Sequence, residues 1–202
     1  MNRIINAMTL AMSSHQNTNH SYNGNPYVLH LSMVVHYAMK YINLIAEEDV
    51  DDVIAACWLH DTIEDCRLTY NDVKNRTNEK VADIVYALTN EKGKNRAERG
   101  NEKYYKGIRE TPNAVFIKLC DRLANVSYSA FSGSRMLQMY ANENDKFLAN
   151  LGLADDDLIN NWNSEIGGFI PSGIARMVNE LKWLLDTHSG TRYGTDGLAG
   201  KV

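Results

Sequence analysis

Apolar residues recur at intervals of three and four along most of the chain, which is the spacing of one buried face of an α-helix. The first stripe runs from Ile4 to Met12, and a second runs from Leu31 to Ile45 after a polar segment at residues 16–25. Only three prolines interrupt the 202 residues. Because strands would show a period of two, the pattern predicts an all-α fold.

Helical periodicity returns in the rest of the chain. It predicts further helices over residues 50–60, 69–88, 112–123, 135–151 and 173–187. Thr69, followed three residues later by Asp72, resembles a capping box that opens one of them. Residues 90–99 are polar and strongly basic, which favours an exposed loop. The Gly-rich end of the chain predicts a loose tail from residue 189 onward.

The length and composition describe one ordinary globular domain. A chain of 202 residues, with 44% apolar and 23% charged residues, is long enough for one core and short for two. The net charge of −4 argues against a general nucleic-acid partner. Cys57, Cys66 and Cys120 form no Cys-x-x-Cys pair, so they predict neither disulfides nor a thiolate zinc site. With no apolar run long enough to cross a membrane, we expect a cytoplasmic protein in a reducing compartment.

The segment from His60 to Asp65 carries the strongest chemical signal. It follows the apolar residues 55–59 directly, and Asp121 likewise follows residues 115–120, which are apolar except for Lys118. A carboxylate beside a core helix is costly to desolvate unless a cation or another partner compensates it. Imidazole and carboxylate ligands without thiolates suit Mn²⁺, Fe²⁺ or Zn²⁺. Such an ion lowers the pKa of bound water, from about 15.7 toward about 7 in the best zinc case, which favours hydrolysis as the reaction class.

Three neighbours of these residues are candidates for catalysis. Glu64 lies one helical turn after His60 and, with Asp65, is a candidate acid or base. Asn125 lies one turn after Asp121 and can orient water or substrate. Each signal also has a common structural alternative: His60 and Asp61 can end a helix beside a solvated acidic loop, and Asp121 can pair with Lys118 or Arg122.

In their order along the chain, three motifs resemble the hydrolase domain of the RelA/SpoT family, especially the small alarmone hydrolases and their metazoan SpoT homologues. Residues 24–30 match Gly-x-Pro-Tyr-x-x-His, and residues 60–65 match His-Asp-Thr-Val-Glu-Asp with Ile63 in place of valine. Residues 118–125 match Lys-Leu-x-Asp-Arg-Leu-x-Asn without change. The resemblance covers roughly residues 4–151, and chance agreement of three ordered motifs is improbable.

The resemblance implies an HD-type helical bundle in one domain, with the metal site in a core cleft. Residues 1–151 would form the HD-type hydrolase domain, residues 152–188 a helical extension packed on it, and residues 189–202 a flexible tail. The implied activity removes the 3′-pyrophosphate from (p)ppGpp, giving GDP or GTP and pyrophosphate. The implied ligands of a Mn²⁺ ion, or of another divalent metal, are His30, His60, Asp61 and Asp121.

The family also implies roles around the metal. Glu64 and Asp65 would assist hydrolysis, in agreement with their placement one turn beyond the histidine. Basic residues in the polar loop and residues of a later helix would bind the nucleotide. The residues at these positions are Lys92, Lys94, Arg99, Arg135 and Tyr140, followed by Glu143 and Phe147 in the same pocket.

One departure from the family bears on the substrate. The family usually has Arg or Lys before the first motif, where this chain has Asn17, Thr18, Asn19 and His20. Three hypotheses therefore stay open: a (p)ppGpp hydrolase, the same metal chemistry on another nucleotide such as NADPH or a nucleotide second messenger, and a non-catalytic nucleotide sensor. The presence of every implied ligand and both acidic helpers argues against the sensor. The pattern leaves the oligomeric state open.

Overall fold

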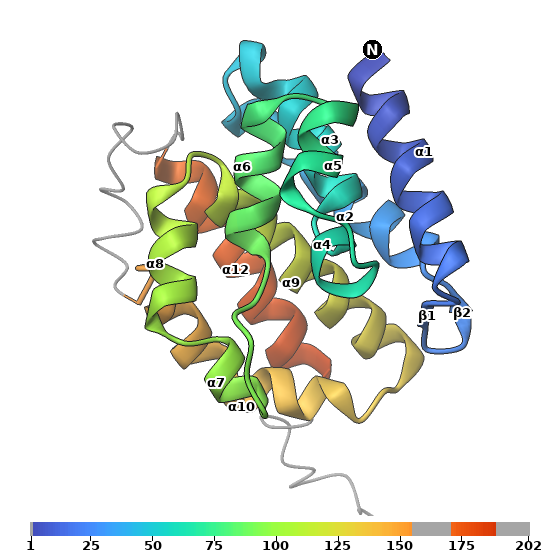
Figure 1. Cartoon of the computed structure of the whole chain (residues 1–202). Helices are drawn as coiled ribbons and strands as arrows, with labels where there is room; N and C mark the ends of the chain where they lie inside the picture. Colours follow the sequence, from blue (N-terminus) through green and yellow to red (C-terminus); the bar gives the residue numbers. More distant parts are fainter. Residues whose placement is uncertain (1, 155–170, 189–202) are drawn as a thin grey trace, which may run out of the picture.

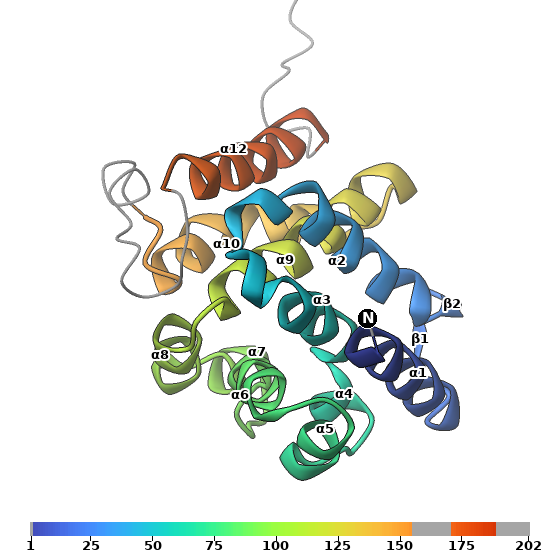
Figure 2. The ribbon, with the colours of Figure 1, turned by 90° about the horizontal axis from the view of Figure 1, so that it is seen from above.

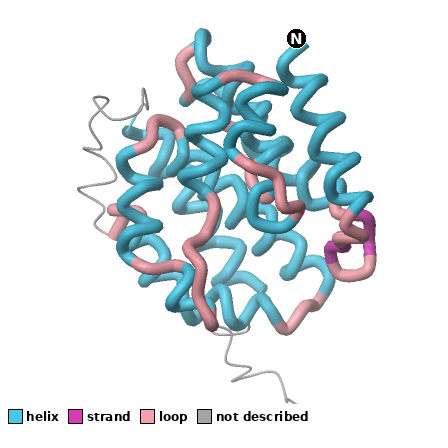
Figure 3. The backbone as a smooth tube through the Cα atoms, viewed as in Figure 1, coloured by secondary structure: helices cyan, strands magenta, loops and turns pink. Residues whose placement is uncertain are grey.

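The protein is a bundle of helices packed around one central helix, α9 (Ala114–Ser132), in a computed structural model that describes residues 2–154 and 171–188 (Figures 1 and 2). Figure 3 shows helix along most of the chain and strand only in one short hairpin. The predicted all-α fold is confirmed. In chain order the other elements are α1 (Asn2–Asn17), β1 (Ser21–Tyr22), β2 (Asn25–Pro26), α2 (Val28–Lys40), η1 (Ile42–Leu44), η2 (Glu47–Asp49), α3 (Val50–Leu59), α4 (Thr62–Asp65), α5 (Tyr70–Arg76), α6 (Glu79–Leu88), α7 (Arg96–Arg99), α8 (Glu102–Glu110), α10 (Met136–Asn150) and α12 (Pro171–His188).

The central helix α9 is apolar on nearly every side. Phe116, Ile117 and Leu119 are fully buried, as expected for a helix with neighbours all round. It packs against α2, α12, α10, α6, α8 and α3. The helix begins at Ala114 rather than at Pro112, because Asn113 has a φ of +66° in the left-handed region and cannot continue a helical turn. Its burial makes α9 a rigid support for the polar residues it carries.

A tight hairpin joins α1 to α2. The predicted polar loop at residues 16–25 is shorter than expected, since α1 continues to Asn17 and β1 pairs antiparallel with β2. The two turn residues Asn23 and Gly24 both have positive φ, at 49° and 81°. An Asn-Gly pair suits such a turn because both residues tolerate the left-handed region. The hairpin places the start of α2, and therefore His30, beside the end of α1.

Two other expectations need correction, and one is confirmed. The helix predicted over residues 31–45 ends at Lys40 and is followed by a 3-10 turn that buries Leu44. Leu44 packs so closely against α12 that a Cβ atom on Gly173 would lie 1.9 Å from a Leu44 methyl carbon. The basic segment at residues 90–99 is largely exposed, but it contains the short helix α7. The capping box is confirmed: the Thr69 N–H donates to Asp72 Oδ2 at 2.8 Å, and the Asp72 N–H donates to Thr69 Oγ1 at 3.2 Å.

Helix α12 lies across α9 and α10 (Figure 2). On it Leu181 and Leu184 face the core, whereas Trp183 is 58% exposed. The predicted tail at residues 189–202 and the segment 155–170 lie outside the described residues. Among the helices within the described ranges, none is both long and apolar enough to cross a membrane.

Candidate metal centre and active-site cavity

Four polar residues meet where α2, α3, α4 and α9 approach one another. His30 lies on the first turn of α2, directly after the hairpin. His60 follows the last residue of α3 and Asp61 precedes the first residue of α4, so the short junction turns both side chains toward the core. Asp121 lies in the middle of α9. Residues far apart in sequence thus supply two imidazoles and two carboxylates to one place.

The ligand atoms lie close enough for one ion. His60 Nε2 is 2.9 Å from Asp61 Oδ2, and His30 Nε2 is 3.3 Å from Asp121 Oδ1. The two imidazole Nε2 atoms are 3.3 Å apart. One ligand atom each from His30, His60 and Asp121 falls within 4.8 Å of the other two. Facing nitrogens and carboxylate oxygens at these distances fit a shared divalent cation.

Hydrogen bonds from neighbouring groups orient the ligands. His60 Nδ1 donates to the Cys57 carbonyl oxygen at 3.0 Å, so in the neutral ring that binds a metal the Nε2 lone pair faces the cluster. The Tyr27 hydroxyl donates to Asp61 Oδ2. Asn125 Nδ2 donates to Asp121 Oδ1 at 2.6 Å and is itself approached by the Tyr22 hydroxyl, which donates to Asn125 Oδ1 at 2.9 Å. Such supporting contacts are typical of metal sites.

The two aspartates are ionised at neutral pH. Burial alone would raise the pKa of Asp61, but the charges of His60 and His30 and their hydrogen bonds lower it well below the usual range. Burial likewise opposes ionisation of Asp121, and the Lys118 ammonium together with His30 and His60 lowers the pKa of this carboxyl. Two buried carboxylates with imidazole neighbours form a donor set suited to a divalent cation.

Glu64 and Asp65 line the cavity beside the cluster. Glu64 is held in place because Asn90 donates to it from its side chain at 2.9 Å and from its backbone N–H at 3.3 Å. Burial, followed by the negative charges of Asp61 and Glu64, raises the pKa of Asp65 to about 7. A carboxyl that exchanges its proton near neutral pH is suited to acid or base catalysis.

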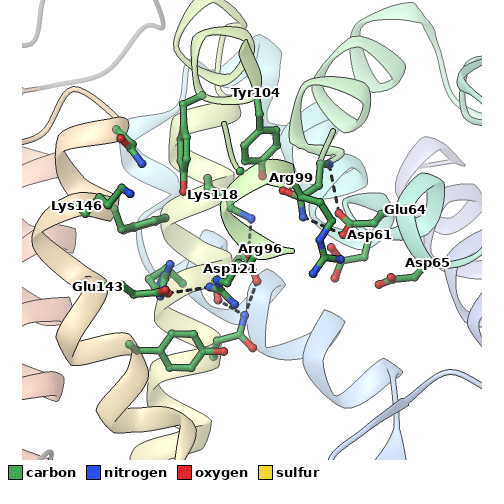
Figure 4. Close-up of a pocket in the computed structure, with 18 of the residues that line it drawn as sticks. Asp61, Glu64, Asp65, Arg96, Arg99, Tyr104, Lys118, Asp121, Glu143 and Lys146 are labelled. Atoms are coloured by element: carbon green, nitrogen blue, oxygen red, sulfur yellow. Dashed lines mark hydrogen bonds and ion pairs between the residues drawn. The ribbon is translucent and has the colours of Figure 1, made fainter. Parts of the chain in front are cut away.

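The cluster opens into a cavity of about 470 Å³, within the size range of small-ligand sites. Figure 4 shows Asp61, Glu64 and Asp65 on one side of it and Glu143 and Lys146 on the other. The Asn125 side chain also lines it.

The predicted substrate-binding residues divide into two groups. Arg99 and Tyr140 line the cavity, whereas Lys92, Lys94 and Arg135 are exposed and do not contribute to its lining.

Sequence reasoning missed several cations of this cavity. Arg96, Lys118, Arg122 and Lys146 all line it. Lys118 and Arg122 belong to the same motif as Asp121, and we considered them only as structural partners of that carboxylate. Lys118 is both a structural partner of Asp121, to whose Oδ2 atom it donates at 3.0 Å, and a cation of the cavity lining.

Residues 17–20, where the sequence differs from the usual family pattern, lie at the junction of α1 and the hairpin. His20 stacks on Tyr27 with ring centroids 4.0 Å apart, and its Nδ1 lies 3.7 Å from Asp65 Oδ2. Among the described residues, the cavity lining includes none of these four. His20 therefore contacts the site through Tyr27 and Asp65 rather than by lining the cavity.

The fold and this centre agree with comparisons to known proteins. The HD domain family matches residues 7–154, and the chain belongs to that family. The chain is 39% identical over 108 residues to the guanosine-3′,5′-bis(diphosphate) 3′-pyrophosphohydrolase of Aquifex aeolicus (strain VF5), covering 51% of this chain and 14% of that protein.

Two metazoan proteins are also similar. The guanosine-3′,5′-bis(diphosphate) 3′-pyrophosphohydrolase MESH1 of Danio rerio is 29% identical over 126 residues, covering 61% of this chain and 67% of that protein. The MESH1 protein of Mus musculus is 29% identical over 105 residues, covering 51% of this chain and 55% of that protein. These similarities confirm the resemblance that the three motifs indicated. The chain spans only a small part of the Aquifex relative and between half and two thirds of the metazoan ones.

Proposed function

We propose that the protein is a metal-dependent phosphohydrolase that converts (p)ppGpp to GDP or GTP and pyrophosphate. This proposal is supported above all by His30, His60 and Asp121, whose ligand atoms lie within 4.8 Å of one another at the edge of a cavity of about 470 Å³. Asp61 Oδ2 lies beside this group, 2.9 Å from His60 Nε2. The relatives from Aquifex, Danio and Mus, named for this reaction, support the choice of substrate.

His30, His60, Asp61 and Asp121 would hold the cation, which we propose to be Mn²⁺. When bound, a divalent cation lowers the pKa of water and polarises a phosphoryl oxygen. The protein groups do the rest. Lys118 and Asn125 fix the Asp121 carboxylate through hydrogen bonds to its two oxygens, and the Cys57 carbonyl fixes the His60 ring.

Asp65 and Glu64 would move the protons. Asp65 has a pKa of about 7, so it can take a proton from the attacking water or give one to the leaving group. Glu64, held by Asn90, would orient the water. Arg99 and Tyr140 line the cavity and are the proposed nucleotide contacts, and Lys92, Lys94 and Arg135, which are outside its lining, stay predictions. The three free cysteines, all buried, support the proposed cytoplasmic location.

A second candidate keeps the metal centre and changes the nucleotide, to NADPH or a nucleotide second messenger. It is favoured by residues 17–20, where His20 stands in a segment that is usually basic in the family. A non-catalytic sensor would have no need for Asp65 beside the cluster, so the geometry supports an enzyme over a sensor.

The test is hydrolysis of ppGpp in the presence of Mn²⁺, with the products separated by anion-exchange chromatography. GDP and pyrophosphate should appear, and EDTA or Asp61→Ala should abolish their formation. Glu48→Gln, which alters an exposed carboxylate outside the cavity, is the matched control and should retain full activity. Release of phosphate from NADPH or another nucleotide in place of ppGpp would favour the second candidate. Binding without turnover of any nucleotide, whatever divalent metal is supplied, would favour the sensor.

A further inference from the structure

Glu143 lies between two arginines that come from different helices. Its Oε1 atom accepts a hydrogen bond from Arg96 Nη2 at 2.8 Å and another from Arg122 Nη1 at 2.7 Å. Arg96 lies on α7, Arg122 on α9 and Glu143 on α10, and all three line the cavity. Figure 4 shows Glu143 across the cavity from Asp61, Glu64 and Asp65. One carboxylate oxygen therefore ties two guanidinium groups together.

Arg122 is a buried, packed residue of the cavity wall rather than an exposed surface cation. Its side chain is only 8% exposed. Its guanidinium carbon lies 4.0 Å from the centre of the Phe147 ring and 4.8 Å from that of Tyr140. Rings at this distance stabilise a cation and hold its plane. A guanidinium offers five N–H groups, and within the described part of the chain Glu143 takes one of them. Further acceptor oxygens can therefore be bound without moving Arg122.

The charges on this wall do not balance. Arg96, Arg122 and Lys146 face the cavity with Glu143 as the acidic residue among them. Lys146 is exposed to solvent on α10 and can turn toward a ligand. The wall therefore keeps a positive surplus opposite the acidic residues beside the candidate metal centre. A nucleotide whose scissile phosphate lies at that centre meets this surplus with its other end.

We propose that Arg96 and Arg122 form a subsite for a second phosphate group of the nucleotide, and that Glu143 occupies this subsite while the cavity is empty. This proposal rests on the proposed function for the position of the first phosphate. A phosphate group carries more negative charge and more acceptor oxygens than a carboxylate, and it matches guanidinium forks well. It can therefore replace Glu143, whose side chain is 27% exposed and can return to solvent. An uncharged end of a ligand cannot.

The consequence is selection of substrate class. A nucleotide phosphorylated at two separate ribose positions can bind the candidate metal centre with one phosphate and the Arg96–Arg122 subsite with the other. One phosphorylated only at the scissile end leaves the Arg96–Glu143–Arg122 bridge closed. Glu143 is thus a specificity-determining residue, because it competes with weak anions and excludes neutral groups.

The test compares two ligands that contain no pyrophosphate bond and therefore cannot undergo the proposed reaction. Binding of guanosine 3′,5′-bisphosphate and of guanosine 3′-monophosphate is measured by isothermal titration calorimetry on the full chain with Mn²⁺. The bisphosphate should bind about tenfold more tightly to the wild type, as expected for one set of charge-assisted hydrogen bonds. Because no turnover is involved, a failure of the hydrolysis assay leaves this comparison readable.

Variants then assign the preference to the subsite. Arg96→Met should reduce the preference for the bisphosphate to about twofold or less, because it removes one of the two proposed phosphate-binding cations. The Arg96 side chain is 57% exposed, so we expect the fold to tolerate the change. Glu143→Gln keeps the acceptor oxygen but removes the competing charge, so the preference should widen several-fold. Lys106→Met removes a charge from an exposed lysine of α8 outside the cavity and should change nothing. Equal binding of the two ligands in the wild type, or a loss of preference with Lys106→Met as large as with Arg96→Met, would overturn the proposal.

Discussion

The Lys118 ammonium donates to Asp121 Oδ2 at 3.0 Å, while the other oxygen of the same carboxylate, Oδ1, faces His30 Nε2 at 3.3 Å. The carboxylate is therefore shared between a fixed cation and the candidate metal centre. Burial opposes the charge on Lys118, but Asp121 raises the pKa of this lysine well above its usual range, so it stays protonated. The Tyr104 ring lies beneath the ammonium at 5.9 Å. The sequence offered pairing with Lys118 as an alternative to metal binding by Asp121. In the structure Lys118 orients the Asp121 carboxylate toward the candidate metal centre.

Replacing Lys118 with methionine should weaken metal binding. The variant keeps most of the apolar side chain but removes one of the two hydrogen bonds that orient Asp121. Loss of such an orienting contact typically costs about 10–100-fold in metal affinity or activity. Titration of the protein with Mn²⁺ by calorimetry measures the change. Lys118→Arg keeps the charge and should retain most of the affinity, and Lys106→Met controls for the loss of one positive charge. Unchanged affinity in Lys118→Met would mean that the hydrogen bond from Lys118 is not needed to orient Asp121.

Divalent metal should stabilise the fold, because the cluster exists only when its four elements are packed together. At a free metal concentration of 100 times Kd, binding adds about 2.7 kcal/mol to the free energy of unfolding. For a chain of this size that corresponds to a rise in Tm of roughly 5–10 °C. Thermal unfolding with Mn²⁺ and with EDTA measures it. Asp61→Ala should lose most of the rise and Glu48→Gln none of it. An equal rise in Asp61→Ala would place the bound ion elsewhere.

Asp65→Asn should separate catalysis from metal binding. The substitution preserves shape but removes the proton that Asp65 exchanges, and loss of a general acid or base typically lowers kcat by about 10²–10⁴-fold. The rise in Tm with Mn²⁺ should persist, because Asp65 is not among the proposed ligands. Initial rates of ppGpp hydrolysis, read beside the thermal shift, test both expectations. Retained activity in Asp65→Asn would assign the proton transfer to Glu64 or to another group.

Much of this site was predictable because its signals are local. Asp121 within the apolar core of α9, and His60 with Asp61 directly after α3, break a hydrophobic pattern in a way that requires a compensating charge. Helical spacing also placed Asn125 one turn from Asp121, where it donates to that carboxylate at 2.6 Å. These relationships depend on the helix repeat and on burial, which a sequence pattern carries directly.

The basic wall was not predictable by the same means. Arg96 and Arg122 meet only because α7 and α10 fold over α9, and nothing in the local pattern of either residue indicates Glu143 as a common partner. The short helix α7 was expected to be a loop, since its N-cap Asn95 lies in a run of polar residues that reads as irregular. Contacts between separate helices are a tertiary property, so a basic cluster in the sequence could not distinguish Arg99, which lines the cavity, from Lys92, which does not.

The turn at Asn23 and Gly24 was a missed local signal. An Asn-Gly pair between two short extended segments is a strong indication of a hairpin, but the surrounding polar residues favoured a loop. The strands are only two residues long, and their side chains show no apolar alternation that would have revealed them.

His15 is a buried neutral histidine at the end of α1. It is 2% exposed, stacks on Tyr27 with ring centroids 4.2 Å apart, and shares a hydrogen bond with His20 between their Nδ1 atoms at 3.0 Å. Burial lowers the pKa of His15 from 6.5 to about 4, and the negative charge of Asp61, which favours the protonated ring, only partly offsets this effect of burial. The folded protein therefore keeps this ring neutral at pH values where the unfolded chain protonates it.

The stability of the protein should fall as the pH is lowered from about 6.5 to about 4, because in this window the unfolded chain binds a proton at His15 that the folded protein excludes. The full shift corresponds to about 3 kcal/mol at most. His15→Gln keeps a polar side chain but cannot titrate, so its free energy of unfolding should depend less on pH across this window, and urea unfolding at a series of pH values measures the difference. His36→Gln, at an exposed histidine of α2, should behave as the wild type does. The same pH dependence in His15→Gln and in the wild type would show that other groups control acid unfolding.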